Sequence, residues 1–131
     1  MAIDYGSRRI GVAVSDSGIL ATPHCVVPNE GDVVETLADL ARQLDATTIV
    51  VGIPRRQFQS RSEKTFDEFA QRLRKKTCKQ VVLWDEALTT VDAAERLRSA
   101  GRTRREAEKD IDMAAAAVIL QSYLDEQRRQ S

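Results

Sequence analysis

The chain has 131 residues, of which 42% are hydrophobic and 31% are charged, and this length and composition predict one globular domain over residues 1–131. Basic and acidic residues number 20 each, so any attraction to nucleic acid must come from local basic patches rather than from net charge. No apolar run approaches the roughly 20 residues of a membrane-spanning helix. No basic and apolar signal peptide opens the chain, so we expect a cytoplasmic protein.

The metal-ligating and redox residues are few. Cys25 and Cys78 lie far apart in the sequence and match no metal-binding or redox spacing, so we interpret each as a small buried apolar residue. His24 is the only histidine, which excludes a histidine-rich metal site. Its place beside Pro23 favours a structural role over a catalytic one.

The first part of the chain predicts three antiparallel strands. Residues 1–4 form a short apolar run, and residues 9–15 alternate large apolar with small side chains, as in a strand with one well-packed face. Residues 19–27 predict a third strand after a serine-glycine turn. Pro23 and Pro28 favour an edge position for this strand, because proline lacks the N–H that an inner strand must donate.

The rest of the chain predicts helices that alternate with short strands. Apolar residues at helical spacing indicate the helices, and nearly continuous apolar runs indicate strands covered on both faces, as in a parallel sheet. In chain order we predict a helix at 33–44, a strand at 47–53, a basic loop at 55–62, a helix around 66–73, a buried strand at 81–84, a helix between Thr89 and Gly101, and a final helix at 110–127. This order predicts an α/β fold with a mixed five-stranded sheet and helices packed on it.

Acidic residues stand at the ends of three predicted elements. Asp4 ends the first strand, Asp85 and Glu86 end the last, and Asp110 and Asp112 open the final helix. A buried, unpaired carboxylate is costly, so Asp4 requires a partner such as a cation. Ligands collect beyond the carboxyl ends of strands, and Mg²⁺ prefers carboxylate oxygens. Two such ions can promote phosphodiester cleavage.

Each acidic pair forces a choice. Adjacent residues of a strand point to opposite faces, so Asp85 and Glu86 do not both face one site, and periodicity leaves the choice open. Asp110 and Asp112 lie about 200° apart on a helix. Asp112 precedes small alanines that can approach the sheet, whereas Asp110 suits the positive end of the helix dipole. The alternative interpretation is that all these acids are helix caps and turn residues.

Five segments of the chain resemble a known family. They are the hairpin IDYGSRRIGVAVSD at residues 3–16, the strand IVVGIP at 49–54, LWDEALTT at 83–90, IDMAAA at 111–116 and ILQSYL at 119–124. In this order and at these distances they resemble the YqgF/RuvX family, which comprises Holliday junction resolvase-like proteins and pre-16S rRNA nucleases. The resemblance spans nearly the whole chain and implies a single RNase H-like nuclease domain.

The resemblance also implies a catalytic site. The acids of the family pattern fall at Asp4, Glu86 and Asp112, which favours Glu86 over Asp85. Their implied role is to bind one or two Mg²⁺ or Mn²⁺ ions for metal-assisted attack of water on a phosphodiester. The implied activity is a metal-dependent nuclease acting on structured nucleic acid, with precursor 16S rRNA favoured over DNA junctions.

Some residues depart from the family pattern. The loop after Pro54 is rich in arginine where the family usually carries asparagine and glycine, and Ala87 replaces a frequent arginine. In this loop Phe58 either stacks on a base or folds onto its own loop. Basic residues near the acids are our candidates for phosphate contacts, although solvated surface is an alternative for each. They are Arg8, Arg9, Arg55, Arg56, Arg61, Arg102, Arg104 and Arg105.

Three other functions remain as alternatives. The chain could resolve Holliday junctions. This activity requires symmetric cutting of two strands, which favours a two-fold homodimer. We expect a homodimer, although the sequence shows no evident interface. It could instead be a non-catalytic nucleic-acid-binding module of the same fold. The Asp4-Tyr5-Gly6 turn also occurs in actin-like ATPases, but these need two such domains.

Overall fold

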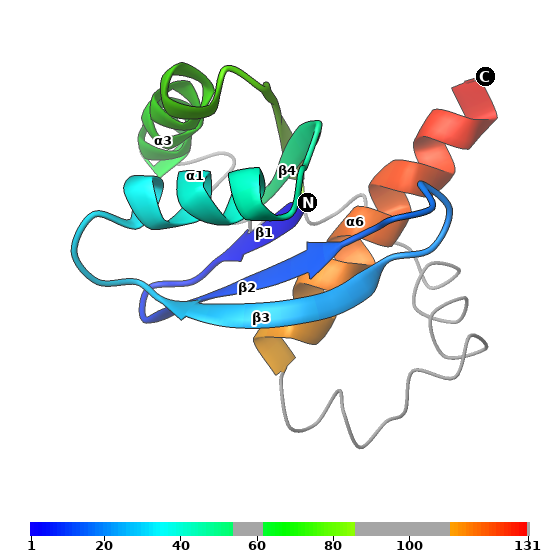
Figure 1. Ribbon diagram of the computed structural model, residues 1–131, viewed down its shortest axis with the longest axis horizontal. Coiled ribbons are helices and arrows are strands. Elements are labelled where there is room, and N and C mark those ends of the chain that lie inside the picture. The colour runs from blue at the N-terminus through cyan, green and yellow to red at the C-terminus, as the bar shows by residue number, and fades with distance from the viewer. Residues whose placement is uncertain (54–61, 86–110, 131) are drawn as a thin grey trace.

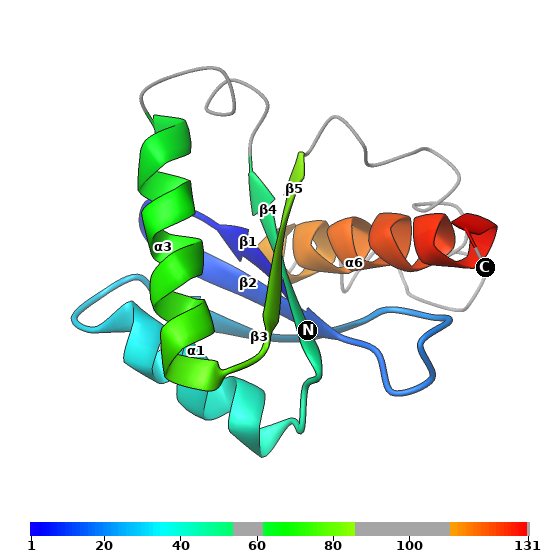
Figure 2. The ribbon, with the colours of Figure 1, turned by 90° about the horizontal axis from the view of Figure 1, so that it is seen from above.

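The computed structural model describes residues 1–53, 62–85 and 111–130, apart from the side chains of residues 62–64, 111 and 112. In this part a five-stranded sheet carries α1 and α3 on one face and α6 on the other (Figures 1 and 2). The elements are β1 (Ala2–Tyr5), β2 (Arg9–Val14), β3 (Thr22–Pro28), α1 (Val33–Gln43), β4 (Thr48–Ile53), α3 (Ser62–Thr77), β5 (Gln80–Asp85) and α6 (Ile111–Gln130).

The sheet has the order β3-β2-β1-β4-β5. The β1–β2 and β2–β3 pairs are antiparallel, and the β1–β4 and β4–β5 pairs are parallel. This confirms the predicted mixed sheet, with an antiparallel meander followed by parallel units. The proline-containing β3 lies at the edge, as predicted. The β-branched β4 lies inside, and all its residues except Thr48 are buried.

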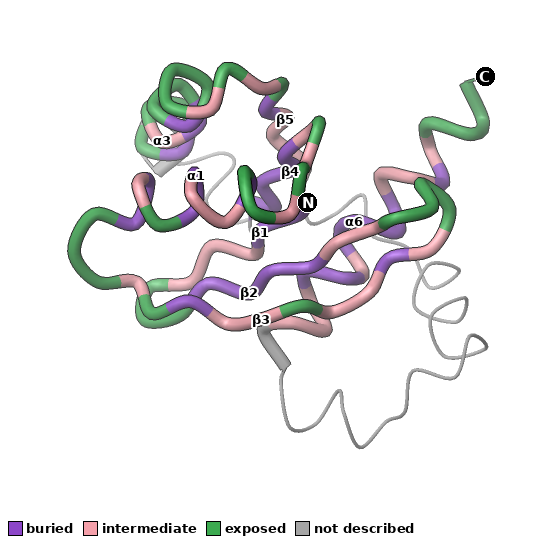
Figure 3. Tube along the Cα trace, in the orientation of Figure 1, coloured by how far each residue is buried: buried purple, intermediate pink, exposed green. Residues whose placement is uncertain are grey.

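Helix α1 begins where the sequence predicts. The Asp32 side chain accepts a hydrogen bond from the Glu35 backbone N–H at 3.1 Å, the usual contact of an N-cap. The apolar face of α1 then packs with α3 on the sheet, where Leu37 and Leu73 are fully buried. Figure 3 shows these buried segments facing the sheet, with exposed segments on the outside. The first core therefore lies between the sheet and the pair of helices α1 and α3.

The second core, beneath α6, is built from smaller residues. Ala2, Ala13 and Val50 of the sheet contact Ala116 and Ile119 of the helix. A Cβ placed on Gly52 would overlap the Ile119 side chain, so this glycine lets α6 lie directly on the sheet. Small residues on both sides therefore set a close approach of the helix to β1 and β2.

Buried polar groups also anchor α6. The Gln121 side chain is fully buried; it accepts a hydrogen bond from the Ala21 N–H at 2.9 Å and donates to the Ile19 carbonyl at 2.8 Å. It also donates to Asp125, which in turn accepts from Arg128. Because these bonds hold residues 19–21 in a turn, β3 starts at Thr22 rather than at residue 19 as predicted.

Three sequence-based expectations are wrong in detail. The β5 strand was predicted to be buried, but only Val81 is buried, because β5 is the edge strand of the described sheet and α6 lies mainly over β1, β2 and β3. Cys78 is exposed in a left-handed conformation (φ 57°) after α3, and Cys25 is half-buried. The final helix extends to Gln130.

Two predicted elements lie outside the described residues: the loop after Pro54 and the helix between Thr89 and Gly101. Within the part of the chain that the structure covers, no helix has both the length and the apolar character needed to cross a membrane.

Candidate functional site

Asp4 lies in a row of paired residues that crosses four strands. It pairs with Gly11 of β2 and Gly52 of β4, and Gly52 pairs with Trp84 of β5. Paired residues share a face of the sheet, and Trp84 belongs to the α6 core. The half-buried Asp4 carboxylate therefore lies on the α6 face, flanked by two residues that have no side chain.

Asp85 lies on the other face of the sheet. It pairs with Ile53, and both Ile53 and Leu83 belong to the core under α1 and α3. Alternation along the strand therefore separates Asp85 from Asp4. Asp85 of the acidic pair is therefore not on the Asp4 face, and Glu86 lies outside the described residues.

Helix α6 begins at the end of the sheet where β1 ends (Figure 2). The turn held by Gln121 follows β2, which is antiparallel to β1, so it lies at the opposite end of the sheet. Asp112 is in the first turn of α6, and it precedes the buried Ala116 by one turn and Ile119 by two. It thus occupies a register position that faces the sheet; its side chain is outside the described set.

The β1–β2 hairpin places Arg9 near Asp4. Arg9 precedes Gly11 by two residues, so it lies on the Asp4 face, diagonally across from Asp4 at about 7–8 Å between Cα atoms. Its side chain is exposed, as is that of Arg8. Of the predicted phosphate contacts, these two are brought to the end of the sheet that carries Asp4.

Asn29 holds this hairpin and was not singled out from the sequence. Its side-chain amide donates to the Gly6 carbonyl at 2.8 Å, and its backbone N–H donates to the Arg8 carbonyl at 2.9 Å. A Cβ on Gly6 would collide with the Arg9 carbonyl oxygen, so the turn requires glycine. The sequence signal that could have found it is the asparagine directly after Pro28.

The sequence matches the RuvX family, described as Holliday junction resolvase, over residues 1–126. The chain belongs to the RuvX family. Proteins named "Putative pre-16S rRNA nuclease" are similar to it: that of Rhodococcus opacus (strain B4) is 42% identical over 139 residues, covering 98% of this chain and 78% of the relative. That of Mycobacterium tuberculosis (strain CDC 1551 / Oshkosh) is 44% identical over 132 residues, covering 96% and 78%.

The remaining candidate catalytic and phosphate-contact residues predicted from the sequence lie outside the described residues. They are Glu86, Arg55, Arg56, Arg61, Arg102, Arg104 and Arg105. Among the side chains that the structure describes, no three histidine, cysteine, aspartate or glutamate residues are close enough to hold a metal ion. Of the three predicted ligands, only Asp4 has a described side chain, so the triad stays a prediction.

Proposed function

We propose that this RuvX-family chain is a nuclease that hydrolyses phosphodiester bonds of structured nucleic acid, with precursor 16S rRNA as its substrate. The names of its relatives support the activity and the substrate. The observation that carries the proposal is the position of Asp4, a half-buried carboxylate at the end of β1 between Gly11 and Gly52. Its carboxylate offers the hard oxygen ligands that a metal-dependent nuclease uses.

We further propose that Asp4, Glu86 and Asp112 hold one or two Mg²⁺ or Mn²⁺ ions. Asp4 fits this role because it offers hard oxygen ligands. Side chains with softer metal-binding atoms lie elsewhere. His24 is exposed on the edge strand β3, and Cys25 packs against the core under α1 and α3. When bound, the cation stabilises developing negative charge and promotes attack by water.

The rest of the chain's contribution is positioning. Strand pairing on both sides of β1 fixes the Asp4 backbone, so the carboxylate is oriented before substrate arrives. Arg9 and Arg8 stand beside it on the hairpin, where they can contact the phosphates that flank the scissile bond. Such contacts fix the register of the nucleic acid without reading its sequence.

Resolution of four-way DNA junctions is the second candidate, and the description of the RuvX family favours it. A junction resolvase makes two symmetric cuts, so this function predicts a two-fold homodimer. Processing of an RNA precursor makes no such demand. The substrate and the oligomeric state are therefore to be measured together.

The deciding experiment is a cleavage assay with Mg²⁺ and with Mn²⁺ on precursor 16S rRNA, unstructured RNA, duplex DNA and a four-way junction. We expect cleavage of the structured RNA to fall at least about 100-fold in each of three variants, Asp4→Asn, Glu86→Gln and Asp112→Asn, because a lost ligand weakens the charge stabilisation. The matched control is Asp85→Asn, because Asp85 lies on the face of the sheet opposite to Asp4, and we expect this variant to retain activity.

Undiminished cleavage by all three variants would remove the metal-nuclease assignment. Loss of activity in Asp85→Asn but not in Glu86→Gln would show that the face assignment is wrong. Preferential cutting of the junction by a dimeric protein would replace the RNA-processing function with junction resolution.

A further inference from the structure

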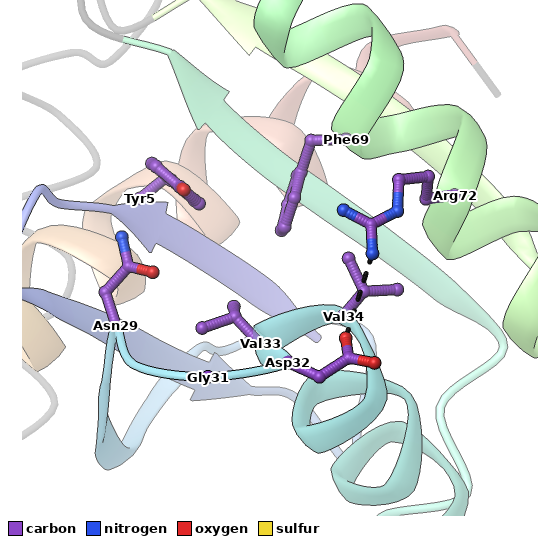
Figure 4. Close-up of a pocket in the computed structure, with 8 residues that line it drawn as sticks. All are labelled: Tyr5, Asn29, Gly31, Asp32, Val33, Val34, Phe69 and Arg72. Atoms are coloured by element: carbon purple, nitrogen blue, oxygen red, sulfur yellow. Dashed lines mark ion pairs between the residues drawn. The ribbon is translucent and has the colours of Figure 1, made fainter.

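A pocket of about 430 Å³ opens at the end of β1 on the face opposite to Asp4 (Figure 4). It lies between β1, the segment that leads from β3 into α1, and helix α3. Its volume is in the range of about 300–1,000 Å³ that is usual for small-ligand pockets. The functional site described above does not use it, since Tyr5 and Asp4 are neighbours on a strand and point to opposite faces.

One side of the pocket is aromatic and apolar. Tyr5 and Phe69, both half-buried, form an edge-on pair with ring centroids 4.9 Å apart and an interplanar angle of 66°. Val33 and Val34 line the pocket beside them, and both are buried. Tyr5 also makes an edge-on contact with Phe66, with ring centroids 5.5 Å apart and an interplanar angle of 82°, and Figure 4 shows the Tyr5 and Phe69 rings bordering the space of the pocket. This side suits a flat ring that stacks on an aromatic face.

The other side of the pocket is polar, and both charged residues that line the pocket lie there. Arg72 of α3 lies 3.8 Å from the Asp32 carboxylate, and their side chains are 65% and 61% exposed. This separation exceeds a hydrogen bond, so the guanidinium keeps donors for a ligand. The Asp32 carboxylate keeps an oxygen beyond the one that caps α1. The side therefore offers donors and an acceptor together, and its carboxylate disfavours a free anion.

The rim of the pocket is fixed before any ligand binds. Asn29, which lines it, is bonded to the Gly6 and Arg8 carbonyls, and these bonds tie the hairpin to the segment that leads into α1. A pocket with fixed walls loses less entropy on binding than one that must order. The same hairpin carries Arg8 and Arg9, so the pocket and the Asp4 site lie at the same end of the sheet, on its two opposite faces.

We propose that this pocket binds a single unpaired nucleobase of the nucleic acid that passes the Asp4 site; the proposal rests on the function proposed above. A nucleobase is flat and uncharged, and its edge carries donors and acceptors. It can stack on Tyr5 or Phe69 while Arg72 donates to it and Asp32 accepts from it. Aromatic stacking combined with a nearby arginine is the common chemistry of single-strand recognition.

The test measures binding without cleavage. The probe is a five-nucleotide single-stranded RNA with 2-aminopurine at its centre, titrated in EDTA, with fluorescence reporting stacking and methyl NMR reporting Val33 and Val34. We expect 2-aminopurine quenching and shifts of both valine signals. Phe69→Leu, which keeps an apolar side chain, raises Kd at least about fivefold because it removes a stacking face.

Charge is controlled with a second pair of variants. Arg72→Gln raises Kd more than Arg42→Gln, which removes the same charge from an exposed α1 residue that pairs with Asp39. Unshifted Val33 and Val34 signals in the wild-type protein, or equal effects of the two arginine variants, would overturn the proposal. Asp4→Asn separates the two proposals, because it should abolish cleavage and leave the Kd for the RNA probe in EDTA unchanged.

Discussion

The anchor of α6 can be tested by replacing Gln121 with methionine, a side chain of similar length. The change removes the bonds to the Ala21 N–H and the Ile19 carbonyl, at 2.9 and 2.8 Å, and the bond donated to Asp125, which keeps Arg128 as a donor. Ala21 is fully buried, so its N–H loses its partner without access to water, which costs about 1–3 kcal/mol. The bond to the Ile19 carbonyl is only partly buried, so its loss costs less than that of the Ala21 N–H bond.

We therefore expect Gln121→Met to lower the free energy of unfolding by about 2–3 kcal/mol, the buried N–H accounting for most of it. Urea denaturation followed by circular dichroism measures this value, with Gln71→Met as the matched control because Gln71 is exposed on α3. A loss below about 0.5 kcal/mol, or one equal to that of the control, would show that the buried bonds do not anchor the helix.

Two further predictions concern packing and thiol reactivity. Gly52→Ala should lower stability by about 1–3 kcal/mol, seen as a lower midpoint in the same urea assay, because the new methyl group displaces Ile119; an unchanged midpoint would contradict the close approach of α6. Burial raises the pKa of the Cys25 thiol, so at pH 8 its thiolate fraction is reduced and iodoacetamide should modify the exposed Cys78 first, as followed by mass spectrometry. Faster modification of Cys25 would show that it is not shielded.

Much of the fold could be predicted from local sequence. The β-branched run in β4, the Asp32 cap and the prolines of β3 each specify a local conformation that tertiary contacts reinforce. The burial of Gln121 could not be predicted, because helical periodicity assigns polar residues to the surface. Nor could the exposure of Cys78, which depends on a left-handed turn between α3 and β5.

The candidate site was predictable in part. Trp84 directly precedes Asp85 in the strand. Had this large apolar residue been assigned to the α6 face, alternation along the strand would have placed Asp85 on the other face. The glycines beside Asp4 were not predictable, since register between strands is a property of the pairing rather than of any one strand. The pocket was equally hidden, because Tyr5, Asn29 and Phe69 come from three distant segments.

The alternation of β1 also makes the site sensitive to chain length. Ile3 and Tyr5 face α1 and α3, whereas Ala2 and Asp4 face α6. A one-residue insertion before Asp4 that shifts the pairing of β1 would exchange these faces, burying the carboxylate in the larger core. A sequence with every motif residue intact would then be inactive. Working relatives should therefore tolerate substitutions in the hairpin far better than single-residue insertions or deletions.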